Sequence, residues 1–190
     1  MKSVDGIKTA VSIGLPNDQE ARAVIGPAYD PTNVLNVIKM FAGTEDMYPA
    51  AVGFIRSLFQ AKGVDPKTRE MIMLRAAKVL RCPYEWDANV VLGKNVGLSD
   101  LEIEAAGSDE AVTGINADYV LICRATDELS LDSTLTDATL AGLLSRYGEV
   151  VCRKLILIIG WFNLLARFLN GCRVPTENFE KLHSKTDPLA

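Results

Sequence analysis

Residues 65–97 read DPKTREMIMLRAAKVLRCPYEWDANVVLGKNVG and encode a helix, a break and a second helix. Asp65 can cap the first amides of a helix, and Pro66 supplies a preset φ at the first helical position. A second proline, Pro83, disfavours the α conformation at Cys82 and suits the first turn of a new helix. The sequence therefore predicts two helices that meet at Cys82.

The same helical punctuation recurs on both sides of this pair, whereas alternating strand patterns are nearly absent. Upstream, Asp30 followed by Pro31 is typical of an N-cap with proline at the first helical position, and Gly43 can close that helix. Downstream, Tyr147 and Gly148 interrupt the helical pattern. The predicted helices span about residues 31–42, 46–61, 66–81, 83–95, 100–106, 111–128, 134–147 and 149–169. We therefore predict an all-α fold.

The length of 190 residues suits one domain with a normal core. Three segments are predicted: an N-terminal arm over 1–29, a helical domain over 30–172, and a polar, weakly ordered C-terminal tail over 173–190. The stretches 65–96 and 136–170 have similar lengths and a break in the middle. This similarity suggests the hypothesis of an internal duplication.

Composition and charge exclude several classes of protein. The net charge of −4 and the pI of about 5.1, without a run of Lys or Arg, indicate that nucleic acid is not a partner. The most apolar segment, 155–166, is shorter than the roughly 20 residues of a membrane span, so we predict a buried core helix and no membrane partner. Residues 1–20 form a poor secretory signal, which favours a cytoplasmic protein.

The cysteines and the single histidine show no ligand or disulfide pattern. We expect reduced thiols, because the cysteines are too widely spaced for a disulfide scaffold or a zinc finger: Cys82, Cys123, Cys152 and Cys172. His183 lies in the polar tail. We therefore expect no metal site.

Three polar side chains share one face of the helix that follows Pro83. Cys82, Glu85 and Asn89 stand at i, i+3 and i+7, so a thiol, a carboxylate and an amide lie on one surface. A thiol at the N-cap would feel the positive end of the helix dipole, which lowers its pKa if the site is accessible, and the first turn likewise favours an ionised Glu85. Glu70 lies beside an apolar run, where burial would raise its pKa and make it a candidate acid.

Each of these residues also has a purely structural interpretation. Glu85 stands where a capping-box acid belongs, and Cys82 could be a buried, inert thiol. Asn89 could bridge two helices. Tyr84 and Trp86 could pack in the core or at a subunit interface instead of lining a substrate pocket.

The order of these motifs resembles the carboxymuconolactone decarboxylase and alkylhydroperoxidase-D-like superfamily. The motifs are Arg69-Glu70-Met71, Cys82-Pro83-Tyr84-Glu85-Trp86, Gly97-Leu98-Ser99 with a short helix at 100–106, and Gly160-Trp161-Phe162-Asn163 with Arg167. The resemblance covers about residues 40–172. It implies a bundle of helical hairpins, a homo-oligomer of three or six subunits, and an active site near a subunit interface.

The chain departs from the peroxidase branch of that superfamily at two positions. The peroxidase motif is a glutamate, a Cys-x-x-Cys pair and a histidine four residues on. Glu70 and Cys82 match its first two members, but Glu85 stands at the second cysteine and Asn89 at the histidine. Without the second thiol no disulfide can form at this spacing, and asparagine cannot relay a proton. The decarboxylase-like branch resembles the chain better at Glu85, although it too usually has the histidine that Asn89 replaces.

The leading interpretation is a decarboxylase-like lyase that acts on a small organic acid or lactone without a cofactor. In this interpretation Glu70 and Glu85 serve as acid and base, and Asn89 orients them by a hydrogen bond. The pocket is lined by Cys82, Tyr84 and Trp86. Two alternatives remain open: a thiol-dependent peroxidase in which Cys82 forms a sulfenic acid, and a non-catalytic oligomeric binding protein.

Overall fold

The computed structural model describes all residues except 1–3, 7–8 and 190. Within that part of the chain the fold consists of helices, with no strand, so the predicted all-α fold is confirmed. The α-helices are α1 (Asp18–Ile25), α2 (Asn36–Ala42), α3 (Tyr48–Phe59), α4 (Pro66–Val79), α5 (Pro83–Asn95), α6 (Asp100–Ala106), α7 (Ala117–Leu131) and α8 (Asp137–Cys172). Three short 3₁₀ helices are η1 (Gly26–Ala28), η2 (Glu45–Met47) and η3 (Phe179–Leu182).

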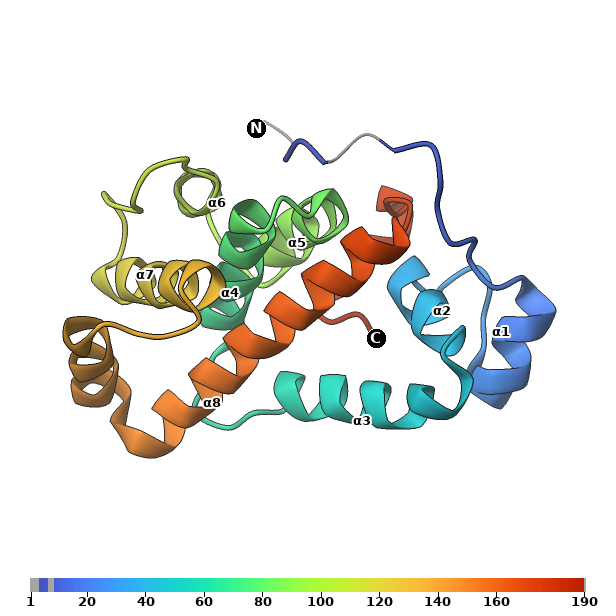
Figure 1. Ribbon diagram of the computed structural model, residues 1–190, viewed down its shortest axis with the longest axis horizontal. Helices are drawn as coiled ribbons and strands as arrows, with labels where there is room; N and C mark the ends of the chain where they lie inside the picture. Colours follow the sequence, from blue (N-terminus) through green and yellow to red (C-terminus); the bar gives the residue numbers. More distant parts are fainter. Residues whose placement is uncertain (1–3, 7–8, 190) are drawn as a thin grey trace.

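Helix α4 is the centre of the fold. It contacts α5, α6, α7 and α8, and Figure 1 shows these helices arranged around it, with α8 crossing the molecule diagonally. Ten of its fourteen residues are buried, and three of them carry a charged or ionisable side chain: Arg69, Glu70 and Arg75. A helix surrounded on all sides buries its polar positions together with its apolar ones.

The joint between α4 and α5 forms as the two prolines predict. Arg81 adopts a positive φ of 53°, and the amide of Cys82 donates to the carbonyl of Ala77 at 2.9 Å, which is the closing bond of a Schellman motif. Cys82 itself is extended, with φ −102° and ψ 96°, and Pro83 occupies the first turn of α5. The chain can therefore reverse within two residues and pack α5 against α4.

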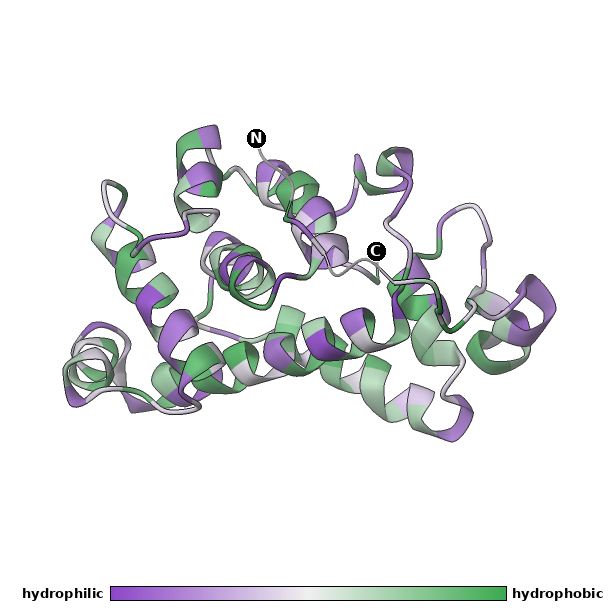
Figure 2. Cartoon of the chain, turned by 45° about the horizontal axis from the view of Figure 1, so that its top comes forward, coloured by the Kyte–Doolittle hydropathy of each residue, from purple (hydrophilic) through white to green (hydrophobic). Residues whose placement is uncertain are grey.

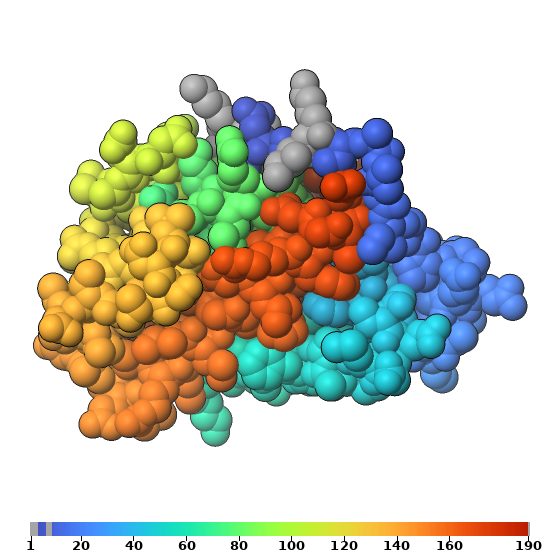
Figure 3. Space-filling model, in the orientation of Figure 1, coloured from blue at the N-terminus to red at the C-terminus, as the bar shows by residue number. Residues whose placement is uncertain are grey.

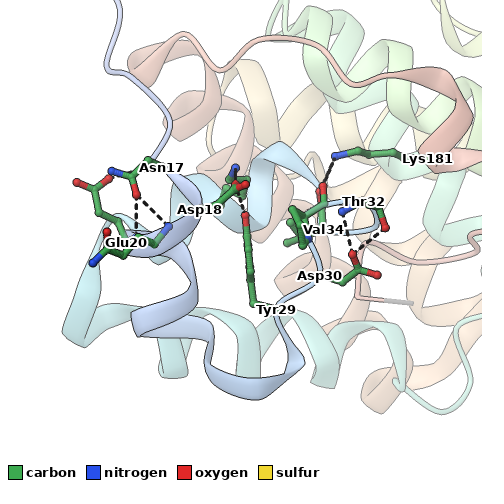
Figure 4. A network of polar contacts seen from close by, with 11 residues as sticks. Asn17, Asp18, Glu20, Tyr29, Asp30, Thr32, Val34 and Lys181 are labelled. Carbon is green, nitrogen blue, oxygen red and sulfur yellow. Dashed lines mark hydrogen bonds and ion pairs between the residues drawn. The ribbon is translucent and has the colours of Figure 1, made fainter.

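The N-terminal arm contains a helix that we did not predict. Asn17 and Glu20 form a capping box that starts α1, and Tyr29 donates to Asp18 behind it (Figure 4). The three-residue spacing of Asn17 and Glu20, which is that of a capping box, was the signal in the sequence for this helix. The segment 18–25 of the predicted N-terminal arm is therefore helical.

The predicted helix start at Asp30 and Pro31 is wrong. The Asp30 carboxylate accepts from the amide and hydroxyl of Thr32, at 2.9 and 2.7 Å, and so forms a local turn (Figure 4). Helix α2 begins only at Asn36, whose amide donates to Glu177 from the C-terminal residues. A capping group distant in sequence therefore determines where this helix begins.

The start of α7 is also later than predicted, at Ala117 instead of about residue 111. The preceding loop is held by Arg75 of α4, which donates to the carbonyls of Ala106, Ser108 and Glu110. The same guanidinium forms a double hydrogen bond with Asp127 of α7, at 2.5 and 2.8 Å. These bonds stabilise an irregular loop where the apolar pattern suggested helix.

Helix α8 is 36 residues long and carries the predicted interruption at Gly148, which has non-helical backbone angles (φ 71°, ψ 168°). It is long and apolar enough to cross a membrane by length and composition, and half of its most apolar window is buried inside the fold. Figure 2 shows hydrophilic residues recurring among hydrophobic ones along the helices. Figure 3 shows one side of α8, in orange to red, lying uncovered on the surface.

The C-terminal residues are more tightly packed than their polar composition suggested. Leu182 and Lys185 are buried, and both of their carbonyls accept from the side-chain amide of Asn95 on α5, at 2.9 and 2.7 Å. Lys181 donates to the carbonyl of Val34 ahead of α2 (Figure 4). The tail therefore closes over α2 and α5 instead of extending into solvent.

The buried clamp of Arg75 leads to a prediction about stability. We expect Arg75→Ala to lower the free energy of unfolding by about 3 kcal/mol, because it leaves Asp127 and three loop carbonyls without their donor. Urea denaturation would measure this. The matched control is Arg146→Ala, because Arg146 pairs with Asp118 at the surface and should contribute less than about 1 kcal/mol. Equal effects of the two substitutions would contradict the assigned role of Arg75.

Candidate functional site

A small enclosed cavity lies between α5, α8 and the region of α2 and α3. Its volume is about 30 Å³. Three residues of α5 bring polar groups to the cavity: Tyr84, Glu85 and Asn89. The other lining residues are apolar or aromatic: Leu35, Val37, Ile38, Ile55, Phe59, Met73, Ala88, Leu92, Trp161, Phe162, Leu165 and Pro188. The predicted helical face of α5 therefore presents a carboxyl and an amide to an apolar cavity.

Glu85 is buried and accepts a hydrogen bond from Nδ2 of Asn89, one turn further along α5, at 3.0 Å. Its carboxyl group turns to Asn89 and not back to cap the helix. Burial raises the pKa of Glu85 to about 7, although the hydrogen bond from Asn89 opposes the shift. The first turn was expected to favour an ionised Glu85, but desolvation outweighs the helix dipole, so the carboxyl is ionised mainly above about pH 7.

Glu70 lies on α4, where it faces α5 near Gly93, and its side chain is 0% exposed. Neither carboxyl oxygen has a hydrogen-bond partner, and the nearest cation, Nε of Arg69, is 4.0 Å away. Burial raises the pKa of Glu70 to about 8, with Arg69 opposing the shift and Glu85 adding to it. Glu70 does not line the cavity itself, so the two carboxyls interact electrostatically without opening on the same space.

Cys82 lies at the N-cap of α5 but is 0% exposed and does not line the cavity. Burial raises the pKa of its thiol to about 12, with Glu85 adding to the shift and the amides of Glu85 and Tyr84 opposing it. The condition for a lowered thiol pKa, an accessible sulfur, is therefore not met. The helix N-terminus favours a thiolate only where the sulfur can also be solvated.

The two aromatic residues of the motif lie on opposite sides of α5. Tyr84 lines the cavity, accepts from the amide of Val37 at 3.0 Å and donates to the carboxylate of Glu177. Trp86 packs against Gly107, where an added Cβ would lie 2.6 Å from the indole. Trp86 therefore packs against the end of α6 and does not line this cavity with Tyr84.

The remaining cysteines and the histidine take no part in the cavity. Cys123 and Cys152 are buried and Cys172 is half-buried. His183 is exposed in the C-terminal segment. Among the described residues, no group of three or more His, Cys, Asp or Glu side chains could hold a metal ion.

Three further residues belong to the site and were not predicted. Arg69 is buried beside Glu70, with its guanidinium carbon 4.2 Å from the centre of the Phe59 ring. Pro188 forms part of the cavity wall, and Glu177 links Tyr84 to the start of α2. A charged pair inside the apolar run of α4 was a signal for Arg69. No local pattern could have identified Pro188 or Glu177, because their partners are distant in sequence.

Comparison with known proteins shows one similarity, to a family model that covers part of the chain. Residues 45–125 match the model of the carboxymuconolactone decarboxylase family. Neither the comparison with curated proteins nor that with solved structures found a match. The matched segment runs from η2 into α7 and contains Glu70, Cys82, Glu85 and Asn89, whereas α8 and the C-terminal residues lie outside it. Residues 45–125, which include the motifs at the α4–α5 joint, are therefore similar to the carboxymuconolactone decarboxylase family, as the spacing of these motifs suggested.

Proposed function

We propose that this protein is a decarboxylase-like lyase in which Glu85 transfers a proton to and from a small organic acid or lactone. The observation that carries the proposal is the position of Glu85, buried at an apolar cavity with a pKa raised to about 7. Near neutral pH both the acid and the base form of such a group are populated. This is the condition that general acid–base catalysis requires.

The proposed step is the loss of carbon dioxide from a substrate that can delocalise a carbanion. The bond between the carboxylate carbon and its neighbour breaks, and the electron pair remains on the substrate as an enolate. Protonated Glu85 then donates its proton to the carbon that has lost the carboxylate. The carboxylate of Glu85 recovers a proton from solvent.

Asn89 and Glu70 would support Glu85 in different ways. The amide of Asn89 donates to Oε2 of Glu85 at 3.0 Å and so fixes the orientation of the carboxyl group. Asparagine can orient a carboxyl but cannot exchange the proton, so proton transfer rests on Glu85 itself. Glu70, with a pKa raised to about 8, is a neutral acid at pH 7 and adds no second negative charge.

The size of the cavity requires that the site opens for a substrate. A cavity of about 30 Å³ is far smaller than the roughly 300–1,000 Å³ of pockets that hold small molecules. Pro188 contributes to the wall from the C-terminal segment, and its neighbours at 186, 187 and 189 are exposed or half-exposed. We infer that displacement of this segment admits the substrate, since the other walls belong to packed helices.

A thiol-dependent peroxidase has less support than a lyase. The thiol of Cys82 is fully buried with a pKa raised to about 12, so the thiolate that attacks a peroxide is not available near neutral pH. The second cysteine of the peroxidase motif is replaced by Glu85. A non-catalytic binding protein remains the alternative to the lyase, and the substitution of Glu85 distinguishes them.

We expect Glu85→Gln to lower kcat for decarboxylation by at least about 100-fold, because glutamine cannot donate or accept the proton. The measurement is carbon dioxide release from a panel of small β-keto acids and carboxylated lactones. Glu104→Gln is the matched control, since Glu104 is an exposed glutamate on α6. Turnover that survives Glu85→Gln would overturn the proposal, and a protein that binds members of the panel without turnover would be a binding protein.

The raised carboxyl pKa values also predict how stability depends on pH. A glutamate titrates near 4.3 in the unfolded chain, and Glu70 at about 8 in the folded one, so between these values only the folded state retains the proton. The free energy of unfolding should therefore fall as the pH rises from about 4.3 to about 8. In Glu70→Gln this decline should be smaller, so the variant gains stability relative to the native protein between about pH 5 and about pH 8. Denaturant unfolding of both proteins at about pH 5 and about pH 8 measures this. If the difference in unfolding free energy between Glu70→Gln and the native protein is the same at both pH values, Glu70 is ionised in the folded protein.

We also propose that the protein is a homo-oligomer that buries the uncovered side of α8. Val150, Leu157 and Leu164 recur every seven residues and are 64%, 54% and 51% exposed. Such a stripe fits the seam between packed helices.

We expect Leu157→Lys to reduce the mass measured by light scattering, because a charge would be buried at that seam. Leu101→Lys on α6, a position with 63% exposure, is the control and should leave the mass unchanged. A native protein that is monomeric at every concentration tested would exclude this assembly.

A further inference from the structure

In the part of the chain that the structure describes, three buried side-chain atoms lack a hydrogen-bond partner, and all three lie together. They are Nε of Arg69 and the two carboxyl oxygens of Glu70. Buried polar atoms in folded proteins are almost always bonded, so an unpaired cluster indicates a missing partner. Nε of Arg69 and Oε1 of Glu70 are 4.0 Å apart, too far for a hydrogen bond between them.

The aromatic ring beneath Arg69 connects this cluster to the cavity. The guanidinium lies over the ring of Phe59, and its Nη1 donates to the carbonyl of the same residue at 3.3 Å. Phe59 lines the small cavity of Glu85 on one side and a surface hollow of about 580 Å³ on the other. The hollow is also lined by Asp65, Pro66, Lys67, Arg69, Val96, Thr186 and Asp187. Arg69 therefore stands between bulk solvent and the cavity.

We propose that Arg69 is the binding site for the carboxylate of a small monocarboxylic acid, whose apolar part extends past Phe59 toward Glu85. The proposal rests on the lyase function, because it specifies how that site would hold an acidic substrate. The guanidinium offers an unpaired N–H at Nε, and carboxylate is the anion that arginine binds best in a buried setting.

The charges around Arg69 and Glu70 fit a single bound anion. Arginine keeps its charge in proteins, although burial lowers the pKa of Arg69. Glu70, protonated near neutral pH, can donate its O–H to the same ligand. The other titratable groups that act on Glu70 are Glu85 from α5 and Asp187 from the C-terminal segment, and both are acidic. Affinity should therefore fall above about pH 8, where Glu70 ionises and repels the anion.

Asp187 gives the proposal a variant that should bind more tightly. It lines the hollow beside Arg69 and attracts it electrostatically, but Oδ1 accepts from the amide of Leu189 and not from the guanidinium. A bound carboxylate would compete with the negative charge of Asp187 for the guanidinium of Arg69. We expect Asp187→Asn to strengthen anion binding, an effect that loss of structure could not imitate.

The test uses the full-length native protein with butanoate as the probe and butanamide as its neutral isostere. Dissociation constants come from ligand-observed and ¹⁵N NMR titrations, which need no turnover. At about pH 6.5, where Glu70 is protonated, butanoate should bind at least about tenfold more tightly than butanamide, the ratio expected for one hydrogen bond to a charged group. Arg69→Gln should abolish the difference. The matched control is Lys67→Gln, which removes the same charge from the same hollow and should leave the difference in place.

Several results would overturn the proposal: equal binding of acid and amide to the native protein, no butanoate binding at all, or a loss in Lys67→Gln as large as that in Arg69→Gln. The comparison of acid with amide on the native protein decides the matter even if Arg69→Gln does not fold. Glu85→Gln separates this inference from the lyase proposal. If that variant binds butanoate normally while turnover proves independent of Glu85, the carboxylate site stands and the proposed chemistry fails.

Discussion

The burial of α4 on all sides is the constraint on which the rest of the structure depends. Four helices contact it, so residues that would lie on the solvent side of an ordinary amphipathic helix lie in the interior. Arg75 satisfies this constraint with two hydrogen bonds to Asp127 and three to loop carbonyls. Arg69 and Glu70 do not satisfy it, because their unpaired atoms face one another at 4.0 Å. The same packing thus produces a structural clamp at one turn of the helix and a candidate binding site at another.

Desolvation by this packing also decides the chemistry available at the α4–α5 joint. A helix N-terminus stabilises a nearby anion by roughly 0.3–1 kcal/mol at exposed positions, which is less than one pKa unit. Burial acts in the opposite direction and more strongly at Cys82, Glu85 and Glu70, whose pKa values rise to about 12, 7 and 8. The thiol is thereby inactivated as a nucleophile, whereas the pKa values of the two carboxyl groups are raised to near neutral pH. The balance favours proton transfer over thiol chemistry.

The two departures from the peroxidase motif are linked in space. Glu85, at the position of the second cysteine, accepts a hydrogen bond from Asn89, at the position of the histidine. A histidine would carry a proton to or from a thiol, whereas an amide can only hold a carboxyl in place. The pair therefore forms a consistent unit of its own within residues 45–125, the segment that matches the family model. The C-terminal residues complete this unit from outside that segment, through Pro188 at the cavity and Glu177 at Tyr84.

The sequence by itself determined the elements whose signals are local. Prolines at 66 and 83 set the starts of α4 and α5, a capping serine set α6, Gly148 interrupted α8, and the spacing of Cys82, Glu85 and Asn89 put them on one helical face. The motif spacing also indicated the resemblance to the family whose model matches residues 45–125. Only the tertiary structure decided which of these groups meet a cavity, because exposure depends on helices that are distant along the chain. It placed Trp86 against Gly107, buried Cys82, moved the start of α2 to the carboxylate of Glu177 and brought Arg69 to the edge of the cavity. The pKa of a carboxyl or thiol follows from that burial, so its chemistry could not be predicted from the helix position alone.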